Sequence, residues 1–162
     1  METRNETTLR LFRSANLDVR VRAATLLLAH DDTPLGILLE ILDELSDQGL
    51  GAATERVLRR RNDPELVGEM IRRLRSPESF VREVACDVLG RRGGPEVTRH
   101  LIAALYDPHM MVRRSAGFAL AERRDPAAAA PLLQRYRESA HDDFNVRLAL
   151  ECALNALGVR FD

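Results

Sequence analysis

The segment "DPHMMVRRSAGFAL", residues 107–120, decides the fold, because an earlier segment repeats its pattern. Residues 76–89 read "SPESFVREVACDVL". In both segments a polar residue precedes Pro, then Val-Arg follows, and a small residue lies four places after the Val. The two segments are 31 residues apart. A fixed period of this size is typical of proteins built from stacked repeats.

The repeat extends over five segments, which are aligned on one hydrophobic residue each. The aligned residues are Val19, Leu50, Val81, Val112 and Val146. Four places later come Ala23, Thr54, Ala85, Ala116 and Leu150, and eight places later come Leu27, Leu58, Leu89, Leu120 and Leu154. Spacings of four and eight place side chains on one face of an α-helix. The sequence therefore predicts that this face is buried in every repeat.

Pro residues mark the helix starts that the repeats predict. A capping residue or Gly precedes Pro at Asp63-Pro64, Ser76-Pro77, Gly94-Pro95, Asp107-Pro108 and Asp125-Pro126. Pro is favoured at the first helical position, where its missing N–H costs nothing. We predict helices near residues 5–13, 17–30, 33–46, 50–61, 64–75, 78–91, 95–105, 109–123, 126–138 and 142–157. No segment alternates polar and apolar residues over a strand's length, so we predict no sheet.

These helices pair into five hairpins, near residues 5–30, 33–61, 64–91, 95–123 and 126–157. One hairpin cannot bury both of its apolar faces, but stacked hairpins share a continuous core. We therefore predict an all-α fold, a right-handed α-solenoid that forms a single domain over residues 1–162.

The composition is that of a soluble globular protein, with 45% hydrophobic and 30% charged residues and a net charge of −1. The apolar runs are too short to cross a membrane, and the polar N-terminus predicts a cytoplasmic protein. All 24 basic residues are Arg. Codon bias in a G+C-rich, bacterial-like genome explains this usage, and selection for the bidentate chemistry of Arg is the alternative.

The Asp/Ser-Pro, Val-Arg and Leu-Gly pattern at a period of 31 residues resembles the short HEAT repeats, which also occur in phycobilin-lyase-like proteins. The resemblance covers about residues 5–158 and is weakest at 46–58. In HEAT repeats, the Arg of Val-Arg and the turn Asp commonly form a ladder from unit to unit. The resemblance assigns this structural role to Arg20, Arg82, Asp107, Arg113 and Arg147.

No catalytic or metal-binding pattern is present in the sequence. The four His residues are scattered over different repeats, and Cys86 and Cys152 lack metal-ligand spacing, so we predict buried free thiols. Gly93-Gly94 follows a helix rather than a strand, so it is a helix stop rather than a phosphate-binding loop. We expect no enzyme activity and no cofactor.

The second helix of each hairpin is expected to line a concave face. Positions two and six after the aligned residue should point outward there, and we predict a protein-binding surface from Val21, Arg56, Glu83, Asp87, Arg114, Phe118 and Leu148. Exposed aromatic and Arg side chains are typical anchors of protein interfaces. Local packing against the adjoining hairpin is an equally good explanation for Phe118.

Arginines cluster at the ends of these second helices, at Arg59, Arg60, Arg61, Arg91, Arg92, Arg123 and Arg124. Cations at a helix C-terminus complement the macrodipole. The alternative is an edge that binds an anion, either on a phosphorylated or acidic protein or on a nucleic-acid backbone. Nucleic acid is the less favoured partner, because the chain is nearly neutral and has no Trp.

The last predicted helix, 142–157, is apolar around most of its circumference. Such a helix should be buried, so we predict that a partner or a second copy of the chain covers it, giving a homodimer. The alternative is that the C-terminal "GVRFD" folds back, with Val159 and Phe161 as the cap.

Together these observations predict a non-catalytic protein-binding scaffold. Two alternatives stay open. One is a phycobilin-lyase-like enzyme or chaperone subunit, and the other is a protein that binds anions or nucleic acid through its Arg-rich edge.

Overall fold

The computed structural model describes residues 4–161 and contains helices and turns, with no strand in that range. The predicted all-α fold is therefore confirmed. The chain divides into two compact units, Met1–Asp63 and Pro64–Asp162. The boundary between them falls between the second and third predicted hairpins.

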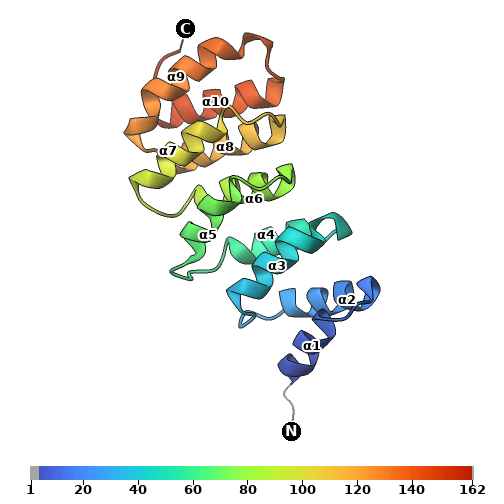
Figure 1. Cartoon of the computed structure of the whole chain (residues 1–162). Coiled ribbons are helices and arrows are strands. Elements are labelled where there is room, and N and C mark those ends of the chain that lie inside the picture. The colour runs from blue at the N-terminus through green and yellow to red at the C-terminus, as the bar shows by residue number, and fades with distance from the viewer. Residues whose placement is uncertain (1–3, 162) are drawn as a thin grey trace. The chain divides into compact units, whose positions relative to one another are not determined.

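The first unit contains four α-helices, coloured blue to teal in Figure 1. They are α1 (Arg4–Phe12), α2 (Leu17–Leu28), α3 (Leu35–Leu45) and α4 (Gly51–Leu58), with a short 3-10 turn at Ser46–Gln48. The hydrophobic core of this unit includes Phe12, Leu27, Ile41 and Leu45. In α3 the sequence "LGILLEILDEL" is apolar on most sides, and accordingly six of its aliphatic residues are buried.

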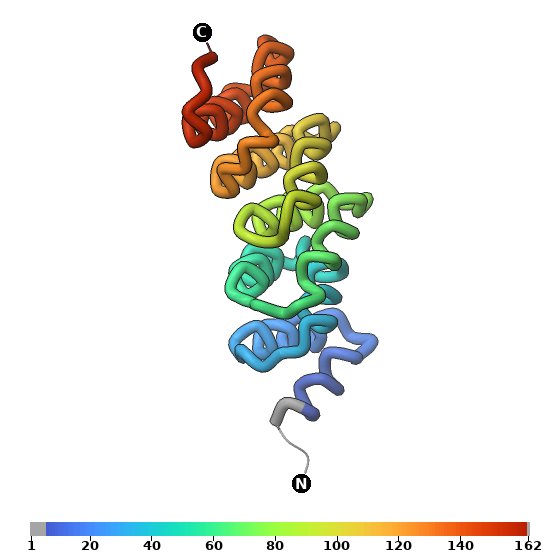
Figure 2. Tube along the Cα trace, turned by 90° about the vertical axis from the view of Figure 1, so that its left-hand side faces the viewer, coloured from blue at the N-terminus to red at the C-terminus, as the bar shows by residue number. Residues whose placement is uncertain are grey.

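The second unit contains six α-helices in two layers. They are α5 (Leu66–Arg73), α6 (Ser79–Leu89), α7 (Pro95–Ala104), α8 (Met110–Arg123), α9 (Ala129–Glu138) and α10 (Phe144–Ala156), with 3-10 turns at Pro126–Ala128 and Ser139–His141. Figures 1 and 2 show α6, α8 and α10 side by side in one layer, with α5, α7 and α9 in the other. In the contact pattern, α8 packs against both α6 and α10.

The predicted buried face is present in both units. All residues at the positions four and eight places after the aligned residue are buried, from Ala23 to Leu154. Thr54 is the polar member of this set, and its hydroxyl donates a 2.8 Å hydrogen bond to the carbonyl of Leu50. Val19 alone among the aligned residues is half-buried, because within residues 4–161 no earlier hairpin covers this side of α2.

The helix starts differ from the prediction at three of the Pro residues. Helices α5, α6 and α8 begin two residues after the Pro, with Glu65, Glu78 and His109 as N-caps. The predicted caps form the preceding turns instead. Asp107 accepts a 2.8 Å hydrogen bond from the His109 N–H, for example, because an Asp side chain readily bonds the backbone two residues later.

Helix ends also differ from the prediction, and most clearly in α4, which ends at Leu58 rather than residue 61. The carboxylate of Asp63, predicted to cap the next helix, instead accepts two 2.8 Å hydrogen bonds from Arg61. Residues 126–128 form a 3-10 turn before α9 rather than its first turn. The exact helix ends therefore depend on side-chain hydrogen bonds, such as that between Arg61 and Asp63, which the repeat pattern does not predict.

The close approach of α8 and α10 depends on Gly117, which lies five residues after Val112. A Cβ atom at this position would lie 2.9 Å from the Cβ of Ala149 and 3.2 Å from its backbone carbonyl carbon. In contrast, a Cβ atom at Gly68, in the middle of α5, would meet nothing within 4 Å. Gly117 is therefore required for the packing of two helices, whereas Gly68 lies in open space and is not.

Gly68→Ala should raise the free energy of unfolding by about 0.5–1 kcal/mol, because Ala is the better helix former. Gly117→Ala should lower it by about 1–3 kcal/mol, since overpacking at a backbone contact outweighs that gain. Urea unfolding followed by circular dichroism measures both. An equal stabilisation by the two substitutions would contradict the packing described for α8 and α10.

Candidate protein-binding surface

Arg82 of α6 joins its own helix to the turns before α6 and α8. Its Nε and Nη2 donate to the two carboxylate oxygens of Asp107, at 2.7 and 2.9 Å. Its Nη1 donates to the backbone carbonyls of Ser76 and Pro77, at 2.9 and 3.0 Å. One guanidinium thus satisfies carbonyls in the turn before its own helix and a carboxylate in the next hairpin.

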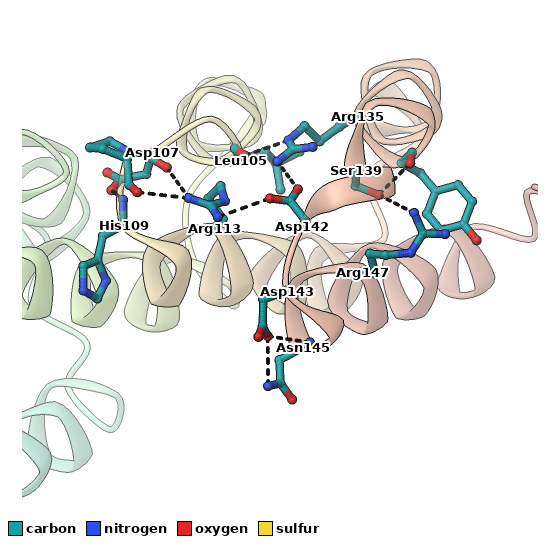
Figure 3. A network of polar contacts seen from close by, with 12 residues as sticks. Leu105, Asp107, His109, Arg113, Arg135, Ser139, Asp142, Asp143, Asn145 and Arg147 are labelled. Atoms are coloured by element: carbon teal, nitrogen blue, oxygen red, sulfur yellow. Dashed lines mark hydrogen bonds and ion pairs between the residues drawn. The ribbon is translucent and has the colours of Figure 1, made fainter.

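Arg113 makes similar contacts one repeat later, but with a single hydrogen bond to the next turn Asp (Figure 3). Its Nη1 donates to the carbonyls of Asp107 and Pro108, at 3.0 and 3.1 Å, and its Nη2 donates to Asp142 at 3.2 Å. Asp107 and Asp142 occupy corresponding turns, so the pattern of Arg to next-turn Asp recurs. These contacts connect α6 to the turn before α8, and α8 to the turn before α10.

The other two ladder arginines have different partners. Arg20, in the first unit, pairs with Glu44 rather than with a turn Asp. Arg147 donates a 3.0 Å hydrogen bond to the Ser139 hydroxyl, and its guanidinium carbon lies 4.6 Å from the Tyr136 ring centroid. Cation–π contact of this kind replaces the carboxylate at this position.

Sequence reasoning missed Arg135, which is buried in α9. Its Nε donates to the Leu105 carbonyl at 3.0 Å, another donor pairs with Asp142, and its guanidinium carbon lies 5.3 Å from the Tyr106 ring centroid. Figure 3 shows Arg113 reaching Asp142 from the left and Arg135 reaching it from above. The available signal was its position three residues after the buried Leu132, on the same helix face.

Asp107 is held in its charged form by this network. Burial alone would raise the pKa of the Asp107 carboxyl, but the hydrogen bonds from Arg82 and from the His109 N–H outweigh it, so the pKa lies below its usual range. A carboxyl whose pKa is lowered by folding contributes stability above its unfolded pKa. That contribution is lost as the pH falls through the folded pKa.

Arg82→Gln should lower the free energy of unfolding at pH 7 by about 2–3 kcal/mol, because it leaves the Asp107 carboxylate without its main partner. The difference from the unsubstituted protein should shrink below about pH 3.9, as Asp107 becomes protonated. Urea unfolding at a series of pH values measures both.

The matched control is Arg91→Gln, since Arg91 pairs at 3.0 Å with Glu122 but is 68% exposed. Solvent screens an exposed ion pair of this kind, so this change should have little effect on stability at any pH. Equal losses at Arg82 and Arg91 would show that the buried ladder adds nothing beyond a surface ion pair.

The outward positions of α6, α8 and α10, together with Arg91 just beyond the end of α6, form one surface of the second unit, here called the second-helix face. Its residues are Phe80, Glu83, Asp87, Arg91, Arg114, Phe118, Glu122, Leu148 and Cys152. Among the predicted binding residues, the structure places Glu83, Asp87, Arg114, Phe118 and Leu148 on this face.

Phe118 lies between two ion pairs on the second-helix face. Arg114, one turn earlier in α8, pairs with Glu83 at 3.4 Å, and Glu122, one turn later, pairs with Arg91. The Phe118 side chain is 38% exposed, and it lines a shallow depression together with Arg91, Arg124 and Ala156. Both predicted roles of Phe118 are therefore compatible with its position, because part of the ring is packed and part is accessible.

Two predicted binding residues lie outside this face. Val21 is half-buried and packs partly against the core of the first unit, and its role in binding stays a prediction. A valine in the first repeat can turn toward Phe12 and its neighbours, since α1 packs against α2. Arg56 is exposed on α4, in the first unit.

The predicted Arg-rich edge is not a row of free cations. Arg61 donates to the Asp31 and Thr33 carbonyls at 2.8 Å each, and Arg123 donates to the Leu89 and Gly94 carbonyls at 3.2 and 2.9 Å. Carbonyls at helix ends and turns lack helical partners, and these guanidinium groups satisfy them.

The remaining members of the predicted edge fall into two groups. Arg59 pairs with Glu55, and Arg92 donates to the carbonyl of Val88. The side chains of the other three are exposed, and they are Arg60, Arg91 and Arg124.

The C-terminal residues fold back onto the last hairpin. Gly158 has a φ of +69°, the Val159 N–H donates to the Leu154 carbonyl at 3.0 Å, and the Phe161 ring packs edge-on against Tyr136, with centroids 5.0 Å apart. The ring of Phe161 therefore packs on α9, while Val159 is bonded to the backbone of α10. Phe144, at the start of α10, is 74% exposed, and self-association through residues 142–157 stays a prediction.

Neither a metal site nor a membrane span is found within residues 4–161. No group of three or more His, Cys, Asp or Glu side chains in this range has metal-binding geometry. No helix in the same range has both the length and the apolar character that crossing a bilayer requires.

Comparison with known families gives one match, to the family described as HEAT repeats, over residues 35–120. The chain belongs to the HEAT-repeat family. The match covers HEAT repeats in general, so the phycobilin-lyase-like subclass stays a prediction. A comparison with curated proteins gave no match.

Among solved structures, two crystal structures of engineered proteins share the fold. The first is 17% identical with a TM-score of 0.56, over 95% of this chain and 79% of the engineered one. The second is 17% identical with a TM-score of 0.54, over 94% of this chain and 47% of the engineered one. The HEAT chain thus spans less than half of the second protein. At this identity the likeness supports the α-solenoid fold alone.

The two cysteines of this HEAT chain differ in accessibility. Cys86 is buried between the layers as predicted, whereas Cys152 is half-buried on the second-helix face. Burial raises the pKa of the Cys86 thiol, and the Asp87 and Asp107 carboxylates raise it further. Because the thiolate is the reactive form, Cys86 should be inert while the protein stays folded.

A thiol reagent such as Ellman's reagent should therefore modify one cysteine of the native protein at neutral pH, and both cysteines in denaturant. Cys152→Ser should remove the fast reaction, while Cys86→Ser should leave it in place. Rapid modification of Cys86 in the folded protein would show that α6 and α8 open far more readily than their packing implies.

Proposed function

We propose that this HEAT-repeat chain is a non-catalytic scaffold that binds another protein through the second-helix face of its second unit. HEAT-repeat solenoids commonly serve as protein-interaction scaffolds, and the family match supports this general role. Recognition would be passive, with the rigid helix layer presenting side chains to a partner.

The observation that carries the proposal is the set of large apolar side chains left exposed on this face. Phe80, Phe118 and Leu148 are each between 37% and 39% exposed, on three consecutive second helices. Each is partly buried and therefore restrained, which lowers the entropy cost of binding. Partly packed aromatic side chains ringed by polar groups are typical centres of protein interfaces.

The charged groups around Phe118 would give the face its specificity. The pairs Arg114–Glu83 and Arg91–Glu122 flank the ring and are partly accessible. A partner that places an apolar side chain on Phe118 must also satisfy these charges, because desolvating them without partners is costly. The proposal therefore specifies a partner with an apolar anchor and polar groups on both sides of it.

The two alternatives from the sequence find less support in the geometry. A phycobilin-lyase-like role requires a sizeable apolar or aromatic cleft for a tetrapyrrole, and the depression beside Phe118 is lined mainly by Arg91, Glu122, Arg124 and small residues. An Arg-rich edge that follows a nucleic-acid backbone requires free cations in a row, and Arg61 and Arg123 are engaged with backbone carbonyls.

Affinity capture from an extract of the source cells, with the tagged chain as bait, tests the proposal. Phe118→Ala and Arg114→Glu should each reduce the recovery of a specific partner by at least about tenfold, which corresponds to about 1.4 kcal/mol of binding energy. The matched control is Leu26→Ala, since Leu26 is more exposed but lies on α2, in the first unit. The same proteins recovered with all three variants would overturn the proposed surface.

Cys152 provides a second measurement with the purified partner. Because its thiol lies on the second-helix face, a bound partner should slow its modification, and the Phe118→Ala chain should lose this protection. An unchanged rate at saturating partner would place the interface elsewhere.

A further inference from the structure

A separate pocket lies in the first unit, at the C-terminal ends of α2 and α4. Its volume is about 690 Å³, and its lining combines the apolar side chains of Leu28, Ala53 and Val57 with Arg56, Arg60 and Arg61. Pockets of about 300–1,000 Å³ are typical of small-molecule sites. The proposed protein-binding surface does not use this pocket, since all of its lining residues belong to the first unit.

Two of these arginines have no hydrogen-bond or ion-pair partner among the side chains and backbone that the structure describes. The side chains of Arg56 and Arg60 are exposed and make no hydrogen bond or ion pair with residues 4–161. Their neighbours are engaged, because Arg59 pairs with Glu55 and Arg61 pairs with Asp63. Arg56 and Arg60 both line this pocket, and their like charges repel each other. An anion between the two guanidinium groups would relieve that repulsion.

Arg61 forms a fixed wall of the pocket. Its three nitrogens are held by the Asp63 carboxylate and by the carbonyls of Asp31 and Thr33, all at 2.8 Å. Asp31 also lines the pocket. Arg61 and Asp63 neutralise each other, so Arg56, Arg60 and Asp31 leave the pocket with a net charge of +1. Leu28, Ala53 and Val57 beside these charges offer no hydrogen bonds to a hydrated inorganic ion, so a ligand with an apolar part fits the pocket better.

We propose that this pocket binds a small anion carried on an apolar body. A carboxylate or phosphate group would lie between Arg56 and Arg60, whose planar donors match both groups. The apolar part of the ligand would cover Leu28, Ala53 and Val57. This site is independent of the protein-binding role, so either one stands if the other fails.

Titrations followed by ¹⁵N-edited NMR of the full chain test the site, with phenyl phosphate, benzoate, inorganic phosphate and benzyl alcohol as probes. Phenyl phosphate or benzoate should shift the amides of residues 53–60 in a saturable manner, and the stronger of the two identifies the preferred anion. Inorganic phosphate and benzyl alcohol should each bind at least about tenfold more weakly, because the first has no apolar part and the second has no negative charge. No saturation with either aromatic anion would overturn the proposal.

Four variants separate this site from general attraction between an anion and Arg side chains. Arg56→Gln and Arg60→Gln should each weaken phenyl phosphate binding by about tenfold, in line with the loss of a charge-assisted hydrogen bond. Ala53→Glu should abolish binding, because it places a carboxylate in the pocket. Ala52→Glu is the matched control, since Ala52 is exposed on the same helix but does not line the pocket.

Equal effects of the two Ala→Glu changes, or unchanged binding in both Arg variants, would overturn the site. The dispersion of the amide spectrum of each variant shows at the same time that the first unit is folded. Loss of binding in the Arg variants with native spectra therefore supports the site itself rather than its scaffold.

Discussion

The second unit depends on the close contact between neighbouring second helices. α8 can pack against α10 at this distance because Gly117 has no side chain where the backbone of Ala149 approaches. The aligned aliphatic residues on both helices are then excluded from water, as at Val112 and Val146. Burying such a side chain contributes about 1.5–3 kcal/mol. Arg82 and Arg113 add direction to this packing, since each connects its helix to the turn of the following hairpin.

Different sides of the second helices carry the residues that stabilise the fold and the residues that are exposed to a partner. The positions that carry the core recur every four residues along each second helix, and the ladder arginines follow the aligned residue directly. Phe118, Leu148 and Arg114 lie on a different side of the same helices, so they are available to a partner without weakening the core. Arg56 and Arg60 likewise make no hydrogen bond or ion pair with the part of the chain that the structure describes. Exposed groups without a structural role are the reasonable places to look for function.

Much of the fold could be predicted from the sequence, because the repeat pattern reports burial directly. The residues four and eight places after each aligned residue are buried without exception. Helix starts were less predictable, since Asp107 can either cap a helix or bond the backbone two residues later, and the choice depends on Arg82 in another hairpin. The inward turn of Arg61 and Arg123 could not be predicted for the same reason. Their acceptors are backbone carbonyls about 30 residues away, and no residue type marks a free carbonyl.

The recurrence of the Arg82 and Arg113 contacts has a consequence for how such a protein can grow. Each of these two links takes its donor from one hairpin and its carboxylate from the next, so the hairpin of α7 and α8 both gives and receives one link. Duplication of a whole 31-residue segment would add a new ladder Arg together with a new turn Asp, so every buried charge would keep a partner. A partial duplication would add an Arg without its Asp, or an Asp without its Arg, and so leave a buried charge unpaired. Lengthening by complete hairpins therefore costs less stability.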